Sequence, residues 1–340
     1  MGIINLNAAP PSRIWLASKT LQAIDSAICA DGGNAFRMWQ GRVFPHMEDA
    51  YRENEDGYRS HLGASVIGGK CTRSIWYAWR WAFKRPPRGK KGEPTEHAES
   101  RMRRLWNRGH LEEARFISML LMIGVQVYQQ EADGKQYRIM NFGGHFSGSG
   151  DGILLNVPDL PAGVPCLAEF KTHSAKSFSD LCDFGVREAK PEHYAQMQEY
   201  MHHFGLLYAL YMAVDKDTDA LHAEILMYDR PVAEHFLERA RQIIFVHTDA
   251  PPPRVRGGNP GYFQCKYLCD FTDVCYHTAQ VDRNCRTCEH VRFREDGTVR
   301  CGLREIFNSP TDNYGILTKE QQLAGCEHYR VGEAFRASSS

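Results

Sequence analysis

No run of about 20 apolar residues, the length that crosses a bilayer as a helix, occurs in this sequence. The chain also lacks the basic start and apolar core of a secretion signal, and the G-x4-G-K-[ST] loop that holds the phosphates of ATP. Lys plus Arg (41) balance Asp plus Glu (41), so net charge gives no sign of a nucleic-acid partner. We therefore expect a cytoplasmic protein without a membrane segment or an ATP-driven motor.

The chain has 340 residues, 43% of them hydrophobic and 24% charged, which allows one large core with an appendage or two modest domains. Hydrophobic spacing predicts helices at about 14–30, 71–83, 96–123, 174–184, 191–212 and 232–247. It predicts strands at about 125–128, 137–142, 152–156, 167–172 and 221–227. This order predicts an α/β fold with a mixed central sheet flanked by helices, followed by a cysteine-rich segment.

Two acidic residues and a lysine stand where strands are expected to begin or end. Asp151 lies in Gly148-Ser149-Gly150-Asp151-Gly152, and Glu169-Phe170-Lys171 follows after a turn. Side chains alternate along a strand, so Glu169 and Lys171 should share one face. Two carboxylates with the Phe170 backbone carbonyl suit Mg²⁺ or Mn²⁺, and the ammonium could orient water or neutralise a phosphate.

Two helices carry further candidates. Gln196 and Tyr200 are four residues apart and should share a helix face, where they could reach a phosphate or simply hydrogen-bond to each other. On the helix expected at 96–123, His110 and Glu113 share a stripe of about 60° with Trp106 and two aliphatic residues. We interpret His110 as a metal ligand, although an inward histidine can also be an ordinary core residue.

One segment is strongly basic although the whole chain is neutral. Between Arg80 and Arg108 there are ten Lys or Arg and three Glu. Such a patch can neutralise phosphates, and the aromatic residues from Trp76 onward could stack on the bases of a single strand. The alternative is a solvated basic surface beside buried core aromatics.

These motifs occur in the order found in the PD-(D/E)xK nucleases. Gly109-His110, Gly148-x-x-Asp151, Glu169-x-Lys171 and Gln196-x-x-x-Tyr200 make the chain resemble their RecB-like branch over roughly residues 70–280. The resemblance implies a restriction-endonuclease-like core and a metal-dependent DNA exonuclease of a bacterial cell or phage-infected host. It implies roles in catalysis or metal binding for Asp151, Glu169, Lys171, His110, Gln196 and Tyr200.

Eleven cysteines in a cytosolic protein indicate metal binding rather than disulfides. In the members of this family that carry an iron–sulfur cluster, one upstream cysteine joins a C-terminal trio. The resemblance therefore implies a [4Fe–4S] cluster on Cys71, Cys265, Cys269 and Cys275. Four thiolates also suit Zn²⁺, which leaves a zinc-bound nuclease without iron as the alternative.

A second set of four cysteines follows the first. Cys285-x-x-Cys288 with the later Cys301 and Cys326 is typical of a structural zinc site, in which His290 or His328 could replace a cysteine. Unliganded thiols in a tail are the alternative. The isolated Cys29, Cys166 and Cys182 are expected to be small apolar residues. A catalytic thiol, with Cys182 near His173 or Cys166 near Glu169, lacks a matching base and oxyanion arrangement.

We predict three segments: an N-terminal helical region (1–69), the nuclease core (70–280) and a cysteine-rich, zinc-binding-like segment (281–340). The expected partner is DNA, as single strands or duplex ends, and the resemblance adds a strand-annealing or single-strand-binding protein. A homo-oligomer is left open. The competing hypothesis is a non-catalytic, metal-stapled DNA-binding or adaptor protein with a vestigial nuclease core.

Overall fold

The computed structural model describes residues 13–44, 58–84, 95–131, 136–276, 278–307 and 315–336. These residues form two compact units, each discontinuous in sequence. Unit 1 takes its described residues from Met1–Tyr51, Ser100–Arg138 and Ser149–Ala233, and unit 2 from Arg52–Glu99, Ile139–Gly148 and Glu234–Ser340. The predicted segments 1–69, 70–280 and 281–340 instead follow the order of the chain and remain a prediction. No described helix is long and apolar enough to span a membrane.

Unit 1 is built on a six-stranded sheet in the order β1-β9-β8-β7-β6-β3. The central pair β7–β8 is parallel, and the four other neighbouring pairs are antiparallel. The mixed central sheet predicted from the sequence is therefore confirmed. Its strands are β1 (Ile14–Leu16), β3 (Gln126–Tyr128), β6 (Gly152–Leu155), β7 (Cys166–His173), β8 (Tyr208–Asp215) and β9 (Leu221–Met227).

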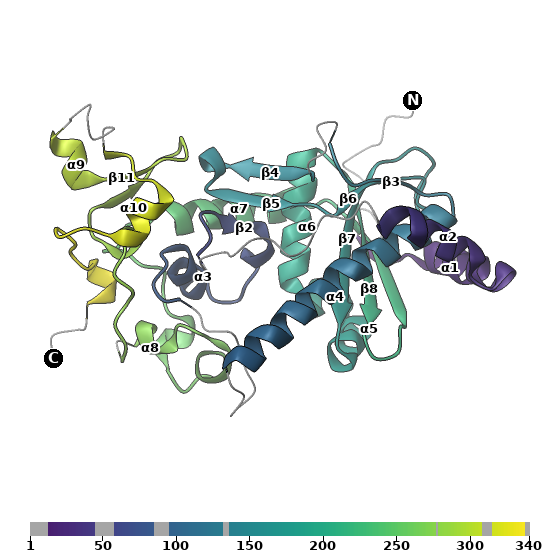
Figure 1. Cartoon of the computed structure of the whole chain (residues 1–340), viewed down its shortest axis with the longest axis horizontal. Coiled ribbons are helices and arrows are strands. Elements are labelled where there is room, and N and C mark those ends of the chain that lie inside the picture. The colour runs from purple at the N-terminus through teal and green to yellow at the C-terminus, as the bar shows by residue number, and fades with distance from the viewer. Residues whose placement is uncertain are drawn as a thin grey trace. The chain divides into compact units, whose positions relative to one another are not determined.

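One face of this sheet is apolar. The long helix α4 (Thr95–Met122, blue in Figure 1) and α1 (Ser18–Asp31) contribute to its core, and α2 (Asn34–Val43) follows α1. Phe116 of α4 stacks on Phe170 of β7, with ring centroids 5.1 Å apart. Burial of these rings stabilises the fold through the hydrophobic effect. Because Phe170 points into this core, its neighbours Glu169 and Lys171 point to the opposite face of β7.

The other face of the sheet is polar although it is also buried. Helices α5 (Ala175–Ala189) and α6 (Pro191–Phe204) cover it. The Tyr211 hydroxyl lies 2.8 Å from His173 Nε2 and 3.0 Å from His193 Nδ1. Burial, followed by nearby lysines, lowers the pKa of His173 to about 4 and that of His193 to about 2. Both imidazoles are therefore neutral at pH 7, and the hydroxyl satisfies one ring nitrogen of each.

Two predictions of helices in unit 1 were wrong in part. The helix predicted at 191–212 ends at Phe204, where Gly205 takes the left-handed conformation (φ 66°), and the chain continues as β8. Because β8 is buried on both faces, it lacks the alternation that marks a strand. At the N-terminus, Ile14–Leu16 does not begin a helix but pairs with β9 as β1.

Unit 2 combines short elements. It contains a three-stranded sheet in the order β2-β5-β4 and a hairpin of β10 and β11. The helix predicted at 71–83 ends at Trp79, and Trp81 has a positive φ of 52° that a helix cannot continue through. The elements are β2 (Leu62–Gly63), α3 (Thr72–Trp79), β4 (Arg138–Asn141), β5 (Phe146–Ser149), α7 (Arg230–Phe245), α8 (Thr272–Cys275), β10 (Val291–Phe293), β11 (Val299–Cys301), α9 (Gly302–Phe307) and α10 (Lys319–Ala324).

The core of unit 2 contains a buried guanidinium. Arg286 lies between the rings of Trp79 and Trp81, 4.2 and 4.0 Å from their centroids. It donates to the Trp79 carbonyl (3.0 Å), the Ser60 carbonyl (2.9 Å) and Gln322 Oε1 (2.9 Å). Cation–π contact and these hydrogen bonds offset the cost of burying the charge.

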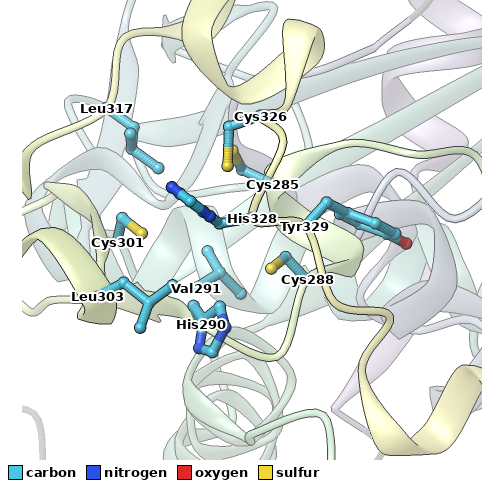
Figure 2. Close-up of a pocket in the computed structure, with 10 residues that line it drawn as sticks. All are labelled: Cys285, Cys288, His290, Val291, Cys301, Leu303, Leu317, Cys326, His328 and Tyr329. Carbon is cyan, nitrogen blue, oxygen red and sulfur yellow. The ribbon is translucent and has the colours of Figure 1, made fainter.

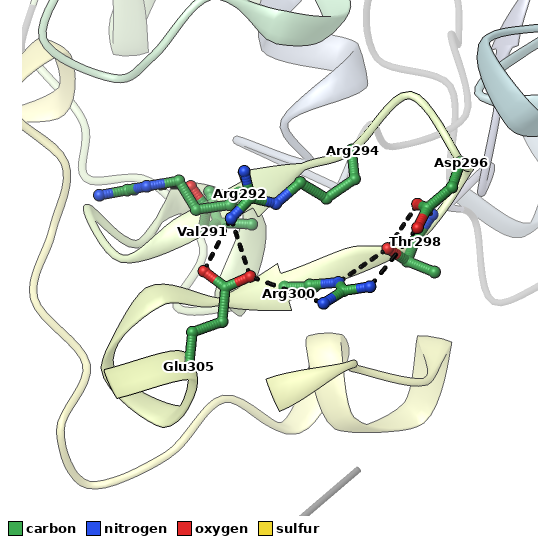
Figure 3. Close-up of polar contacts among 7 residues, drawn as sticks. All are labelled: Val291, Arg292, Arg294, Asp296, Thr298, Arg300 and Glu305. Atoms are coloured by element: carbon green, nitrogen blue, oxygen red, sulfur yellow. Dashed lines mark hydrogen bonds and ion pairs between the residues drawn. The ribbon is translucent and has the colours of Figure 1, made fainter. Parts of the chain in front are cut away.

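The β10–β11 hairpin is closed by polar contacts (Figure 3). Asp296 Oδ1 accepts the N–H of Thr298 (2.8 Å) and its hydroxyl (2.6 Å), while Arg294 donates to both oxygens of Glu305 at 2.8 and 3.0 Å. The turn glycine Gly297 meets Gly143 so closely that a Cβ on Gly143 would lie 2.1 Å from its nitrogen. This hairpin carries Cys301 at its end and holds it in place.

The pH dependence of stability should report one buried carboxylate. Burial raises the pKa of Glu199 on α6 to about 8, against an ordinary 4.5, and neither carboxylate oxygen has a hydrogen-bond partner in the described part of the chain. Between these values the unfolded chain has released a proton that the folded chain retains. The free energy of unfolding should therefore fall as pH rises from 5 to 8, by up to about 1.4 kcal/mol per pH unit from this group.

Glu199→Gln should flatten that slope, measured by urea unfolding at several pH values. The control Glu188→Gln, an exposed position on α5, should keep it. Identical slopes for wild type and Glu199→Gln would show that this carboxylate does not titrate as described.

Candidate active site

The three residues predicted for catalysis lie on neighbouring strands of unit 1. Glu169 and Lys171 stand on the central strand β7, two residues apart. Asp151 immediately precedes β6, which pairs antiparallel with β7. Its Oδ2 accepts the N–H of Phe170 at 2.7 Å, which fixes the carboxylate beside β7. The sheet register thus brings together two fragments that are separated by a turn in the sequence.

Glu169 is fully buried, and its charge has one neighbour of opposite sign. Oε1 pairs with the Lys171 ammonium, while Oε2 has no hydrogen-bond partner among the described residues. Burial raises the pKa of Glu169, and Lys171 opposes that shift. Burial and then the charge of Glu169 raise the pKa of Asp151 well above its usual range. The carboxylates of Asp151 and Glu169 therefore repel each other in a buried environment that screens their charges poorly.

Lys171 is the cation at the centre of this group, and 26% of its side chain is exposed. Burial alone would lower its pKa, but Glu169 and then Asp151 outweigh burial and raise it. The ammonium therefore keeps its proton at any working pH. A permanent positive charge at this position can stabilise negative charge that develops on a phosphate.

Glu113 of α4, which shares the stripe of His110, is a further member of this group. Its charge raises the pKa of Asp151, Glu169 and Lys171. His110 Nδ1 lies 3.5 Å from Glu113 Oε1, and 49% of the His110 side chain is exposed. Glu113 thus forms one acidic group with Asp151 and Glu169, and His110 lies at the edge of this group.

The composition of this group fits a divalent cation. Asp151, Glu169 and Glu113 supply three carboxyl groups beside the ammonium of Lys171, and the raised pKa values of Asp151 and Glu169 mean that a further positive charge such as Mg²⁺ or Mn²⁺ would favour their ionised forms. In the described residues, no three His, Cys, Asp or Glu side chains already stand at the mutual spacing of metal ligands. Cation binding by these carboxylates and the ligand role of the Phe170 carbonyl stay predictions.

Gln196 and Tyr200 lie on α6, and both are buried. Gln196 Nε2 donates to the Tyr200 hydroxyl at 3.3 Å, which is the contact expected of an ordinary helix-face pair. Burial raises the pKa of Tyr200, followed by the charges of Glu169 and Asp151. The phenol therefore lies within electrostatic reach of the acids, so a supporting role beside them remains a prediction.

The basic and aromatic segment separates into several parts. Trp76, Tyr77, Trp79 and Trp81 are buried, so the core interpretation of these aromatics is confirmed. Arg80 is also buried and donates to the Val246 and Arg286 carbonyls, so it does not form a phosphate-binding surface. Residues 85–94, with Arg85, Arg88, Lys90 and Lys91, lie outside the described part. Arg101, Arg103, Arg104 and Arg108 lie on α4.

The first cysteine set lines one pocket of unit 2, together with Tyr77 and Phe271. Cys71 caps α3, where its sulfur accepts the N–H of Ser74 at 3.4 Å. Burial raises the pKa of Cys71, and the nearby Cys269 and Cys275 raise it further. Four sulfur donors around one pocket match the donor set of an iron–sulfur cluster or a zinc ion. The set is Cys71, Cys265, Cys269 and Cys275.

The second cysteine set lines another pocket of unit 2 (Figure 2). Cys285 begins the turn that contains Arg286, Cys301 ends β11, and Cys326 follows α10. Figure 2 shows the ring of His328 among the sulfur atoms, and His290 also lines the pocket. Burial raises the pKa of Cys285 to about 12, helped by its cysteine neighbours. The donors present, including Cys288, are those of a structural zinc site.

The remaining cysteines differ from one another. Cys166 is buried in the apolar core as expected, whereas Cys29 and Cys182 are exposed, contrary to the prediction. Cys182 Sγ lies 3.6 Å from His222 Nδ1 rather than beside His173. Burial, with Asp183 next, raises the pKa of Cys182, so its thiol stays protonated. A protonated thiol is a poor nucleophile, which argues against the catalytic-thiol hypothesis.

Comparison with known proteins gives distant similarities only. No protein-family model matches this chain, and no curated protein matches it in sequence. Among solved structures it is similar to SSO0001, at 15% identity and a TM-score of 0.34, over 71% of this chain and 94% of that one. It is also similar to LHK-Exo in complex with dAMP, at 14% identity and a TM-score of 0.33, over 61% of this chain and 89% of that one.

A second structure of LHK-Exo, an alkaline exonuclease from Laribacter hongkongensis, is 13% identical with a TM-score of 0.33. This similarity covers 54% of the present chain and 86% of that one. At these TM-scores the similarities carry no argument about activity.

Glu113 can be tested as a contributor to metal binding. Glu113→Gln removes one of the three negative charges beside Lys171, and we expect Mn²⁺ to bind about tenfold more weakly. Calorimetric titration with Mn²⁺ measures the change. Asp25→Asn, which removes an exposed charge from α1, serves as the control and should leave the affinity unaltered. Equal affinity of wild type and Glu113→Gln would exclude Glu113 from the site.

Proposed function

We propose that this chain is a divalent-metal-dependent DNA exonuclease that hydrolyses phosphodiester bonds in recombination or DNA end processing. One observation carries the proposal: Asp151 and Glu169 meet beside Lys171 on adjacent strands, with Glu169 buried and one of its oxygens unpaired among the described residues. Surplus negative charge next to a fixed ammonium is the arrangement expected for binding a cation and a phosphate together.

Each side chain has a distinct role in this proposal. Asp151 and Glu169 would hold Mg²⁺ or Mn²⁺, with the Phe170 carbonyl and His110 as further ligands. The bound ion would lower the pKa of a water molecule and offset charge on the phosphate. Lys171 holds its proton and stabilises the negative charge that develops on the phosphate oxygens. Gln196 and Tyr200 support the phosphate from α6, and Glu113 adds negative charge that favours cation binding.

The two cysteine sets are proposed as structural metal centres of unit 2. Cys71, Cys265, Cys269 and Cys275 would hold a [4Fe–4S] cluster, and Cys285, Cys288, Cys301 and Cys326 a zinc ion. The support is that each set lines one pocket, where Cys71 joins a distant trio in the first set and Cys301 and Cys326 join the Cys285–Cys288 pair in the second. Short elements with little regular structure gain folding free energy from such centres.

The proposed partners follow from the proposed reaction. DNA would bind as single strands or as duplex ends, and a strand-annealing or single-strand-binding protein would receive the product strand. A homo-oligomer that encloses DNA is compatible with this function. The setting proposed is the cytoplasm of a bacterial cell or of a phage-infected host.

Hydrolysis of end-labelled DNA tests the proposal. Wild type should degrade single-stranded or duplex DNA when Mg²⁺ or Mn²⁺ is present and fail when a chelator removes it. Lys171→Ala should lower the rate by about 100-fold or more, because it removes a charge aimed at the transition state. Lys176→Ala, an exposed position on α5, is the matched control and should retain full activity.

Two outcomes would contradict the proposal. Equal rates for wild type and Lys171→Ala would reject the assigned roles. A wild-type protein that binds DNA but never cleaves it, with either metal, would support a vestigial core in a DNA-binding or adaptor protein.

Metal content tests the cysteine assignments separately. Anaerobically purified wild type should be brown and contain both iron and zinc. Cys265→Ser should lose iron and keep zinc, and Cys285→Ser should lose zinc and keep iron. Cys29→Ser, at an exposed cysteine of α1, should lose neither. Zinc alone in the wild type, with no visible colour, would overturn the iron–sulfur assignment.

A further inference from the structure

Trp106 on α4 is the most exposed tryptophan among the described residues. Its exposed fraction is 60%, whereas Trp76, Trp79 and Trp81 are buried and Trp15 and Trp39 are partly buried. A tryptophan on the surface leaves a large apolar area in water, and an isolated case needs no explanation. Here its place on α4 relative to the acidic group gives it a meaning.

Trp106 lies on the same side of α4 as Glu113, a member of the acidic group. Glu113 is seven residues further along the helix, which is close to two full turns, and His110 is four residues along. All three therefore share one side of α4, with about 10 Å along the axis between Trp106 and Glu113. The charge of Glu113 acts on Asp151, Glu169 and Lys171, and Trp106 lies two helical turns before Glu113 along α4.

The helix surface next to Trp106 is open at Gly109. Gly109 lies inside α4, where glycine is about 1 kcal/mol less favourable than alanine. A Cβ added at Gly109 would meet no atom within 4 Å, so packing does not require glycine there. Gly109 follows Trp106 by three residues, so this open space lies beside the exposed aromatic ring on the helix surface.

The geometry points to Trp106 as a nucleobase-stacking residue of this site. A base of the strand being hydrolysed stacks on the indole, and the space at Gly109 admits the neighbouring sugar and phosphate. The occupant is an unpaired stretch of DNA, because only an unpaired base offers a free face to the ring. The inference rests on the proposed nuclease function and adds the residue that holds the strand over Asp151, Glu169 and Lys171.

The distribution of charged residues along α4 is compatible with a bound single strand of DNA. Arg103 is exposed and lies one turn before Trp106, so the indole stands between a basic residue and the acidic group along the helix. Phosphates on one side of the stacked base would meet the guanidinium of Arg103. The scissile phosphate on the other side would meet Lys171 and a bound cation. A polyanionic strand with exposed bases matches this order of charges.

The binding of oligothymidylate, measured without divalent metal and with a chelator present, tests the inference independently of hydrolysis. DNA should quench the tryptophan fluorescence of the wild type. Trp106→Ala should bind about tenfold or more weakly, as expected for the loss of one stacked base. Trp106→Phe should keep most of the affinity but lose the quenching, whereas Trp39→Phe should retain both.

Two glycine-to-alanine variants test whether DNA binding needs the open surface at Gly109. Gly109→Ala and Gly41→Ala both place a methyl group where no atom lies within 4 Å, the latter on α2. Both should raise the melting temperature, because alanine favours a helix. Gly109→Ala should also weaken binding of the oligonucleotide, whereas Gly41→Ala should leave it unchanged.

The outcomes separate this inference from the proposed function. Equal affinity of wild type and Trp106→Ala, or quenching that persists in Trp106→Phe, would overturn the stacking role even if the protein hydrolyses DNA. A chain that binds DNA through Trp106 but never hydrolyses it would keep the stacking role and lose the nuclease proposal.

Discussion

A carboxylate buried within a β-sheet needs a compensating charge, and in this protein Glu169 has Lys171. The two residues lie on the same face of the central strand, so the backbone that pairs with β6 and β8 also sets their separation. The pair is not self-sufficient, because Asp151 and Glu113 add more negative charge than one ammonium can balance. The remaining imbalance is the physical basis of the proposed cation site.

The sheet of unit 1 separates stability from chemistry by face. One face packs apolar side chains against α4 and α1, where the Phe116–Phe170 stack lies. The other face carries Glu169, Lys171, His173 and Tyr211 beneath α5 and α6, and its polar groups form hydrogen bonds with one another. Phe170 links the two faces, since its ring lies in the apolar core while its N–H holds Asp151. A change in core packing at Phe170 would therefore move the acidic group.

Local rules were sufficient to predict part of this arrangement from the sequence. The alternation in Glu169-Phe170-Lys171 predicted their common face. The resemblance to cluster-bearing nucleases gave the first cysteine set and cysteine spacing gave the second, and each set lines its own pocket. The strand β8 was not predicted, because residues buried on both faces show no period of two. The effect of Glu113 on Asp151 and the exposure of Trp106 depend on where α4 lies against the sheet, which no pattern within α4 records. For the same reason, the buried aromatics of α3 and the exposed Trp106 looked alike in the sequence.

The account depends most directly on where a divalent cation binds. Crystals soaked in Mn²⁺ would locate the ion by its anomalous scattering. We predict Mn²⁺ between the carboxylates of Asp151 and Glu169, with Lys171 close by but not bound to the metal. Manganese bound only elsewhere on the molecule, with those two carboxylates empty, would contradict the assignment of this site.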